Sequence, residues 1–223
     1  TKVNIDMIIN GYNAFAKEKR VDSDDLQVLF EITLSNLKSD GDIDEQDFID
    51  RADILCSLGQ TVLISNYQEY YKLIRYFSTM TKKRMGLIMG TNNLDALFDE
   101  KYYRDLDGGI LEAFGVLFTR DLKVYVYPSK IDGKDELVTS TNIDIHPRLR
   151  PLYNYLLSNG RIADLEEHDP DVLWIQSRMA LKKIRAGENG WEKMVPNYVD
   201  VIIKKNRLFG YYPELFYKAT TES

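Results

Sequence analysis

The chain has 223 residues, of which 44% are hydrophobic and 29% charged, the composition of an ordinary globular protein. Its formal net charge of −6 argues against a general nucleic-acid binder, because such a protein needs a basic face. The single cysteine, Cys56, excludes an internal disulfide and a cysteine-rich metal site, and its neighbours Leu55 and Leu58 place it in the predicted core. A lone cysteine is typical of a reducing compartment, so we expect a cytoplasmic protein.

No apolar run approaches the roughly 18 residues that a membrane span needs, and no secretory leader is visible, so we expect no membrane partner. Lysine and arginine gather at 82–84, 182–185 and 204–207, each near the end of an expected helix. Basic residues complement the helix dipole there, so we interpret these groups as solvated side chains. The chain begins with Thr1 rather than Met, which leaves open that it is a fragment of a longer protein.

Residues 1–60 are predicted to be helical. From Ile5 to Phe15, apolar residues recur with nearly the period of an amphipathic helix, although Gly11 weakens the pattern. A second helix is expected to follow the acidic turn at 22–25, because its apolar residues keep the same spacing. They are Leu26, Leu29, Phe30, Thr33 and Leu37.

The second helix is expected to end at 39–41, and a third to run from Asp44 to a stop at Gly59. The acidic run at 40–44 faintly resembles a calcium loop. Glu45 and Arg51 stand where that loop requires glycine and glutamate, so a helix-capping turn is the better interpretation.

Strands and helices alternate from Thr61 onward. A strand is predicted at 61–65, then a helix with apolar residues at Tyr70, Leu73, Ile74 and Phe77, then a strand at 85–89. These three elements are expected to form a right-handed parallel β-α-β unit. The elements expected further on are helices at 94–103 and 110–118, a strand at 122–127, a hairpin flap over 122–140 turning at Asp132-Gly133, a helix at 149–157, a strand at 161–165, and helices at 169–187 and 197–207.

The turn after the strand at 85–89 is the most informative stretch for function. Gly90, Thr91, Asn92 and Asn93 separate the strand from an amphipathic segment, as when a buried parallel strand turns into a helix. In an open α/β sheet, ligands gather at this carboxyl edge, and free N–H groups at a helix start favour phosphate. The sequence therefore predicts a nucleotide-type pocket here. A turn without a ligand, with the asparagines as helix caps, is the alternative.

Separated segments resemble the bacterial nicotinate-mononucleotide adenylyltransferases of the HxGH nucleotidyltransferase superfamily. Residues 88–94 read I-M-G-T-N-N-L, where the family has I-M-G-A-D-N-L. Residues 175–181 are similar to the family's I-S-S-T-x-I-R, and 194–196 to its L-V-P. The strand at 123–127 resembles the family's V-V-x-R-P strand, and the resemblance covers roughly residues 61–210.

The resemblance implies a Rossmann-like parallel sheet flanked by helices. On this basis the chain divides into a helical N-terminal segment at 1–60, a nucleotidyltransferase-like domain at 61–210 and a tail at 211–223. The implied ligands are ATP with Mg²⁺ and a pyridine mononucleotide, with no tightly bound cofactor. Adenylyl transfer needs no enzyme nucleophile, since the substrate's phosphate attacks the α-phosphorus; the protein aligns two anions and neutralises charge.

Carried over residue by residue, the resemblance adds Ser177 and Arg178 to the phosphate site and offers Phe98 as the aromatic that stacks on the pyridine. The chain departs from the family because it lacks the H-x-G-H signature, having only His146 and His168. Leu181 also replaces the family's phosphate-binding arginine, and Asn92 its acidic residue, so no catalytic residue is assigned.

Three readings therefore stay open. The chain is an adenylyltransferase-like enzyme completed by an upstream segment or a partner chain, a catalytically silent nucleotide-binding relative that senses or scaffolds, or a structural protein. A homo-oligomer is compatible with each. The run at 166–169, which contains His168, has metal-ligating residue types, but a solvated loop is the better interpretation and no metal site is expected.

Overall fold

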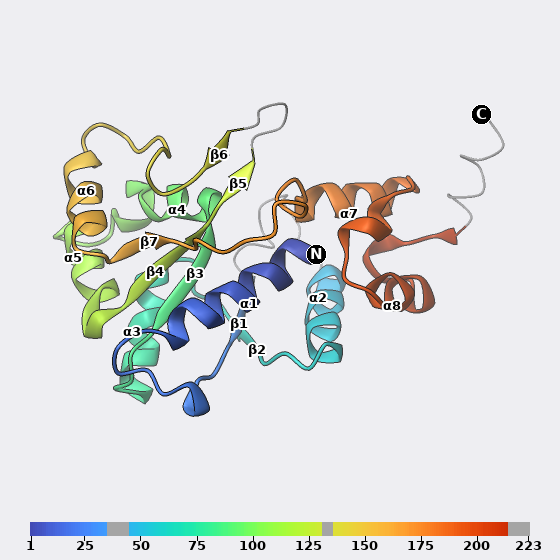
Figure 1. Cartoon of the computed structure of the whole chain (residues 1–223), viewed down its shortest axis with the longest axis horizontal. Coiled ribbons are helices and arrows are strands. Elements are labelled where there is room, and N and C mark those ends of the chain that lie inside the picture. The colour runs from blue at the N-terminus through green and yellow to red at the C-terminus, as the bar shows by residue number, and fades with distance from the viewer. Residues whose placement is uncertain (35–44, 131–135, 214–223) are drawn as a thin grey trace. The chain divides into compact units, whose positions relative to one another are not determined.

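The computed structural model describes residues 1–34, 45–130 and 136–213 (Figure 1). These residues form α-helices and parallel β-sheets, which confirms the predicted α/β class. The chain divides into two compact units: unit 1 comprises Thr1–Asp6, Gln27–Asn66 and Ile175–Ser223, and unit 2 comprises Met7–Leu26 and Tyr67–Trp174. The units cut the chain differently from the sequence-based domains, because residues 175–210 group with the early part of the chain.

Unit 2 is built on a three-stranded parallel sheet. Its strands, in spatial order, are β3 (Gly86–Gly90), β4 (Lys123–Tyr127) and β7 (Ile162–Asp164). Gly90 pairs with Tyr127 and Val126 with Asp164. The carboxyl ends of all three strands therefore meet at one edge of the sheet, where ligands bind in open α/β folds.

The hydrophobic core of unit 2 lies on one face of this sheet. Val124 and Val126 point into it, as expected for alternate residues of a strand. The helices that cover this face are α3 (Tyr70–Met80), α4 (Thr91–Leu97), α5 (Gly109–Leu117) and α6 (Arg150–Ser158), with the 3₁₀ turns η3 (Glu100–Tyr103) and η4 (Thr119–Asp121) between them. Each of the four helices was predicted from its apolar spacing.

The other face of the sheet packs against the part of α1 (Lys2–Ala16) that belongs to unit 2, from Met7 onward. Phe15 meets Tyr125 edge-on, with 6.3 Å between the ring centres. A side chain at Gly11 would place its Cβ 2.1 Å from Ile88, so glycine permits this approach. The glycine that weakens the helical pattern thus lets α1 lie on the sheet, and helices cover both faces as in Rossmann-like folds.

A small antiparallel hairpin follows β4. Its strands are β5 (Ser129–Lys130) and β6 (Leu137–Val138), with Ser129 opposite Val138. This confirms the predicted hairpin flap, while its Asp132-Gly133 turn lies outside the described residues.

Unit 1 contains a β-α-β arrangement that the sequence did not predict. The parallel strands β1 (Phe30–Thr33) and β2 (Val62–Ser65) flank α2 (Glu45–Ser57), and the 3₁₀ turn η1 (Ser23–Asp25) precedes them in unit 2. The helix predicted from Leu26 onward is therefore wrong at 30–33. A short apolar run fits both the helical period of about 3.6 residues and the strand period of two, and here the pairing with β2 makes the segment a strand. The predicted helix end and the calcium-like run at 39–44 lie outside the described residues.

The parallel β-α-β unit predicted from the strands at 61–65 and 85–89 is wrong, because these two strands lie in different sheets. β2 pairs with β1, whereas β3 pairs with β4. The helix between them, α3, is present as predicted. Local patterns predict the elements, but strand partners depend on contacts distant in sequence.

The C-terminal part of unit 1 is helical. It consists of α7 (Ser177–Ala186), η5 (Trp191–Met194), α8 (Val199–Asn206) and η6 (Leu208–Gly210). Trp191, Met194 and Ile203 are almost completely buried within it. α7 begins at Ser177, not near Asp169 as predicted, while α8 confirms the helix expected at 197–207.

Two sequence-based placements need correction. Cys56 is exposed on α2 rather than buried in the core. Arg84, expected to be a solvated residue, has a side chain that is only 20% exposed and forms an ion pair with Glu18. Among the described residues, no helix is both long and apolar enough to cross a membrane.

Candidate functional site

The turn from β3 to α4 lies at the carboxyl edge of the unit 2 sheet, as predicted. Thr91, its first helical residue, is 3% exposed, and its hydroxyl lies 2.7 Å from that of Ser129. Because Ser129 follows β4, this hydrogen bond joins the segments that leave two neighbouring strands. The β3–α4 turn therefore has a fixed position on the sheet, which a preorganised binding site requires.

The first turn of α4 offers unused backbone donors. Gly90 is its N-cap residue, with φ −76° and ψ 165°, and no side chain among the described residues caps the helix. Asn92 and Asn93 are exposed and lie inside the first turn, so they are not the N-caps that the sequence favoured. Helix-start N–H groups without an intrahelical partner bind water or an anion.

The space above Gly90 is open. A Cβ built at this position meets no atom within 4 Å, and its φ lies in the region that any residue adopts. Neither packing nor backbone geometry therefore requires glycine here. Glycine therefore adds no side chain in the open space beside the start of α4.

The carboxyl end of β7 is occupied by a structural hydrogen-bond network. Asp164 accepts from the backbone N–H of Ser140 at 2.7 Å and from its hydroxyl at 2.8 Å. The Tyr153 hydroxyl donates to the Ser140 carbonyl at 2.6 Å. Burial, and then the charge of Asp164, raise the pKa of Tyr153 to about 12. Asp164 thus holds the segment after the hairpin in place.

His168 is a polar residue of this region that the sequence analysis assigned to a solvated loop. Its ring meets Tyr127, the last residue of β4, edge-on at 6.4 Å. Its Nδ1 is buried and has no hydrogen-bond partner among the described residues. The sequence feature that could have placed His168 near this edge of the sheet is its position shortly after the strand predicted at 161–165. Among the residues that the structure describes, no three His, Cys, Asp or Glu side chains are grouped so that they could hold a metal ion.

Phe98 does not have the position expected of a stacking residue. It is 4% exposed and packs edge-on against Phe114 and Tyr153, each at 5.1 Å between ring centres. A ligand ring would have to displace core side chains to reach it. We therefore correct its assignment to a core residue.

The other predicted phosphate residues, Ser177 and Arg178, belong to unit 1. Both are exposed at the start of α7. The Ser177 hydroxyl lies 3.4 Å from that of Thr1 and 3.5 Å from Oδ1 of Asn4. The structure therefore describes the two parts of the predicted site in separate units, and only the β3–α4 turn lies on the three-stranded sheet.

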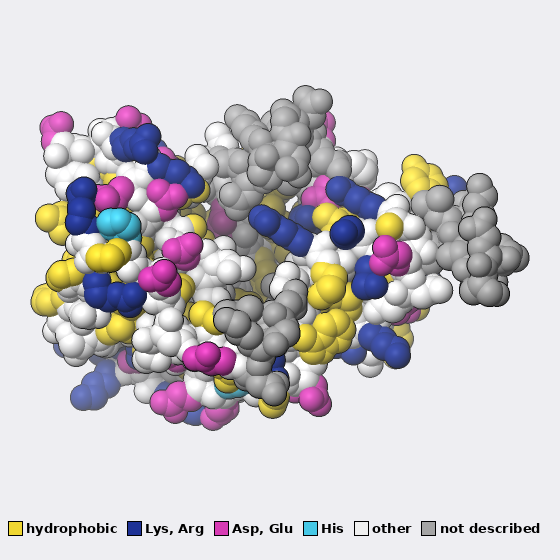
Figure 2. Space-filling model, turned by 90° about the horizontal axis from the view of Figure 1, so that it is seen from above, with side chains coloured by type: hydrophobic (Ala, Val, Ile, Leu, Met, Phe, Trp, Pro, Cys, Tyr) yellow, Lys and Arg dark blue, Asp and Glu magenta, His cyan; other side chains and the backbone are white. Residues whose placement is uncertain are grey.

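Charges of both signs are mixed on the one face of unit 2 that Figure 2 shows. On the face shown in Figure 2, basic and acidic side chains are interspersed over its helices, at the left of the view, rather than gathered into one basic area. This distribution agrees with the negative net charge of the chain. It favours a small anion held locally over a long phosphate backbone.

Comparisons with protein-family models, with curated proteins and with solved structures found no match to this chain. The adenylyltransferase resemblance therefore remains an expectation carried by its motif residues.

Proposed function

We propose that unit 2 binds a mononucleotide or ATP through its phosphate at the β3–α4 turn. The observation that carries the proposal is the uncapped start of α4 beneath the open space at Gly90. The N–H groups of the turn would contact the phosphate oxygens, and the Thr91–Ser129 hydrogen bond keeps them in place. Exposed Asn92 and Asn93 supply further hydrogen-bonding groups beside this position.

The proposal is for binding, with adenylyl transfer as the activity that the family resemblance implies. In-line transfer between two phosphates requires cations placed around the bridging oxygens. The family positions that match Ser177 and Arg178 lie in unit 1, so we assign them no contact with the nucleotide. Mg²⁺ is usually held largely by substrate phosphates, and we assign it no protein ligand. A silent relative that senses or scaffolds is the alternative function.

Thermal unfolding with ATP, nicotinate mononucleotide or inorganic phosphate tests the binding. A ligand at about one hundred times its Kd stabilises the folded state by ~2.7 kcal/mol, which raises Tm by several degrees. Gly90→Val should remove that shift, because its side chain occupies the approach to the N–H groups. Asp95→Ala, at an exposed position later on the same helix, is the control.

The outcomes separate the three readings. Pyrophosphate release from ATP and the mononucleotide would assign adenylyl transfer, whereas a shift without release would assign binding alone. If no nucleotide raises Tm, or if Gly90→Val keeps the full shift, the β3–α4 turn is only a structural connection.

A further inference from the structure

A second candidate site lies at the opposite, amino-terminal edge of the unit 2 sheet. A cavity of about 540 Å³ opens there between α5, α6 and the segments that enter the strands. This volume falls in the range of small-molecule pockets. Its lining residues are Arg84, Leu111, Phe114, Gly115, Phe118, Asp121, Leu122, Lys123, Leu152, Tyr155, Leu156, Asn159, Gly160 and Arg161.

The helical walls of this cavity carry apolar side chains, together with Tyr155 and Asn159, while most of the lining surface is polar. Leu111 and Phe114 come from α5, and Leu152 and Leu156 from α6. Leu111 is 67% exposed and Tyr155, on the same side of α6, is 63% exposed. Large side chains with apolar surface therefore line the cavity and are accessible to a ligand.

Gly115 lines the cavity on the α5 side and is itself exposed. It lies inside a helix, where glycine costs about 1 kcal/mol relative to alanine. Its φ is not positive, and a Cβ would meet no atom within 4 Å, so neither geometry nor packing requires glycine. A larger side chain would extend into the cavity.

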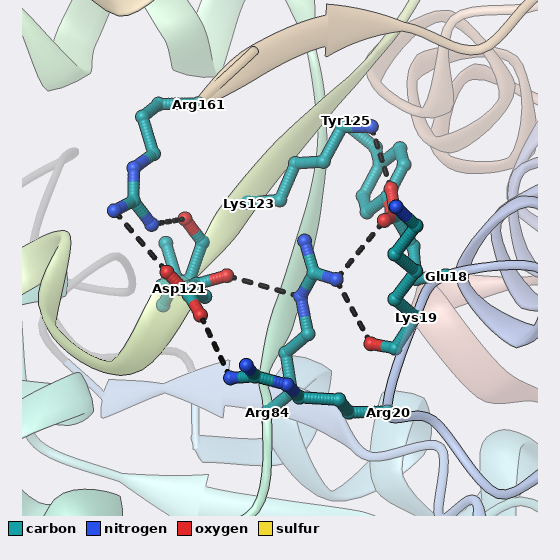
Figure 3. A network of polar contacts seen from close by, with 9 residues as sticks. Glu18, Lys19, Arg20, Arg84, Asp121, Lys123, Tyr125 and Arg161 are labelled. Atoms are coloured by element: carbon teal, nitrogen blue, oxygen red, sulfur yellow. Dashed lines mark hydrogen bonds and ion pairs between the residues drawn. The ribbon is translucent and has the colours of Figure 1, made fainter. Parts of the chain in front are cut away.

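The strand side of the cavity is basic. Arg84, Lys123 and Arg161 line it, and together with Arg20 they share two carboxylates, those of Glu18 and Asp121 (Figure 3). The ion pairs of Glu18 measure 3.0 Å to Arg84 and 2.6 Å to Lys123. Arg161 lies 3.4 Å from Asp121. Three of these cations but only one of the carboxylates, that of Asp121, line the cavity, so its base carries net positive charge.

Two guanidinium groups at this base have unused donors. Arg84 donates through Nε to the Asp121 carbonyl and through Nη1 to the Lys19 carbonyl. Arg161 uses Nη1 toward the Leu122 carbonyl and Nη2 toward Asp121. Within the described ranges, the hydrogen bonds and ion pairs of these two side chains use Nε and Nη1 of Arg84 and Nη1 and Nη2 of Arg161. These side chains are only 20% and 32% exposed, so an anionic acceptor would gain from both charges.

We infer that this cavity binds a small amphipathic anion, with its apolar body between α5 and α6 and its carboxylate or phosphate head against Arg84 and Arg161. The apolar side chains of α5 and α6 and the open space at Gly115 match the apolar body of such a molecule. The basic residues at the base of the cavity match its anionic head. The inference is independent of the nucleotide proposal, because the β3–α4 turn lies at the opposite edge of the sheet.

Isothermal titration of the full chain with decanoate, decyl phosphate, decanol and decylammonium tests this inference. Decanoate or decyl phosphate should bind at least about tenfold more tightly than decanol, because only an anion accepts charged hydrogen bonds from the arginines. Decylammonium should bind more weakly than decanol. The preferred anion identifies the head group as carboxylate or phosphate.

Two pairs of variants locate the binding. Gly115→Leu should abolish anion binding without lowering Tm, since it fills open space and improves the helix, whereas Gly115→Ala should retain binding. Arg161→Gln should weaken anion binding about tenfold while leaving decanol binding unchanged. Arg148→Gln, at an exposed ion pair outside the cavity, is its control. Equal affinity for decanol and the anions, or full affinity in both Gly115→Leu and Arg161→Gln, would overturn the inference.

Discussion

The carboxylate of Asp50 accepts a hydrogen bond of 2.6 Å from the backbone N–H of Phe209, although the two residues are 159 positions apart in the chain. Asp50 is 2% exposed on α2, and its other oxygen accepts from Gln46 at 2.7 Å. Phe209 has a φ of +56°, a conformation that costs non-glycine residues about 1–2 kcal/mol. The buried carboxylate thus helps to hold a strained turn in unit 1.

We predict that Asp50→Ala lowers the free energy of unfolding by about 1–3 kcal/mol, because it leaves the part-buried N–H of Phe209 without its acceptor. Chemical denaturation measures the change, and amide exchange at Phe209 should become faster. Asp53→Ala, at an exposed position on the same helix, is the control. Equal effects of the two substitutions would contradict a specific role for Asp50.

Glu18 joins α1 to the amino ends of β3 and β4. Burial raises its pKa, but hydrogen bonds from Lys123 and Tyr125, with the charges of Lys123 and Arg84, outweigh this and lower the pKa below its usual value near 4.5. A carboxyl whose folded pKa is lowered contributes stability above its unfolded pKa. That contribution is lost as the pH falls from about 4.5 through the folded pKa.

Glu18→Gln should therefore destabilise unit 2 at neutral pH, and the difference from the unmodified chain should shrink as the solution is acidified. Denaturation midpoints measured between neutral pH and about pH 3 test this. Glu167→Gln provides the comparison, since its ion pair with Lys17 is long at 3.8 Å and exposed. A difference that does not change with pH would show that the charge of Glu18 contributes nothing.

The pKa of Tyr153 predicts a loss of stability at alkaline pH, whereas that of Glu18 predicts a loss at acidic pH. Burial raises its pKa from 10.0 to about 12, so the folded state retains its proton where the unfolded state releases it. The contribution of Tyr153 to the free energy of unfolding is fully present below about pH 10 and is lost between pH 10 and 12. Tyr153→Phe should cost about 1 kcal/mol at neutral pH through the lost bond to Ser140, and this cost should diminish above pH 10. Tyr155→Phe, at an exposed position of α6, should change neither the stability at neutral pH nor its dependence on pH above 10.

Phe98 should affect stability rather than ligand recognition. Phe98→Ala removes a ring that packs on Phe114 and Tyr153, and buried Phe→Ala substitutions cost about 3–5 kcal/mol. Phe98→Leu should retain most of the stability that Phe98→Ala loses, and it should retain the whole of any nucleotide-induced shift in Tm. Loss of that shift in a stable Phe98→Leu protein would return Phe98 to the binding site.

The sequence alone determined most helices and strands of unit 2. The spacing from Tyr70 to Phe77 predicted α3, and the apolar run at 122–127 predicted β4. It also placed Gly90 at a strand end followed by a helix start. These features depend on residues that are neighbours in the chain, where hydrogen bonding and side-chain direction follow a fixed period.

Only the tertiary structure decided which surfaces meet. It made Phe30–Thr33 a strand by pairing it with β2, and turned Phe98 into the core. It also brought Arg84 and Arg161 to one cavity beside Gly115. Such contacts join segments far apart in the chain, and their energy depends on which faces are buried together. No local pattern carries that information, because the same short apolar run satisfies more than one partner.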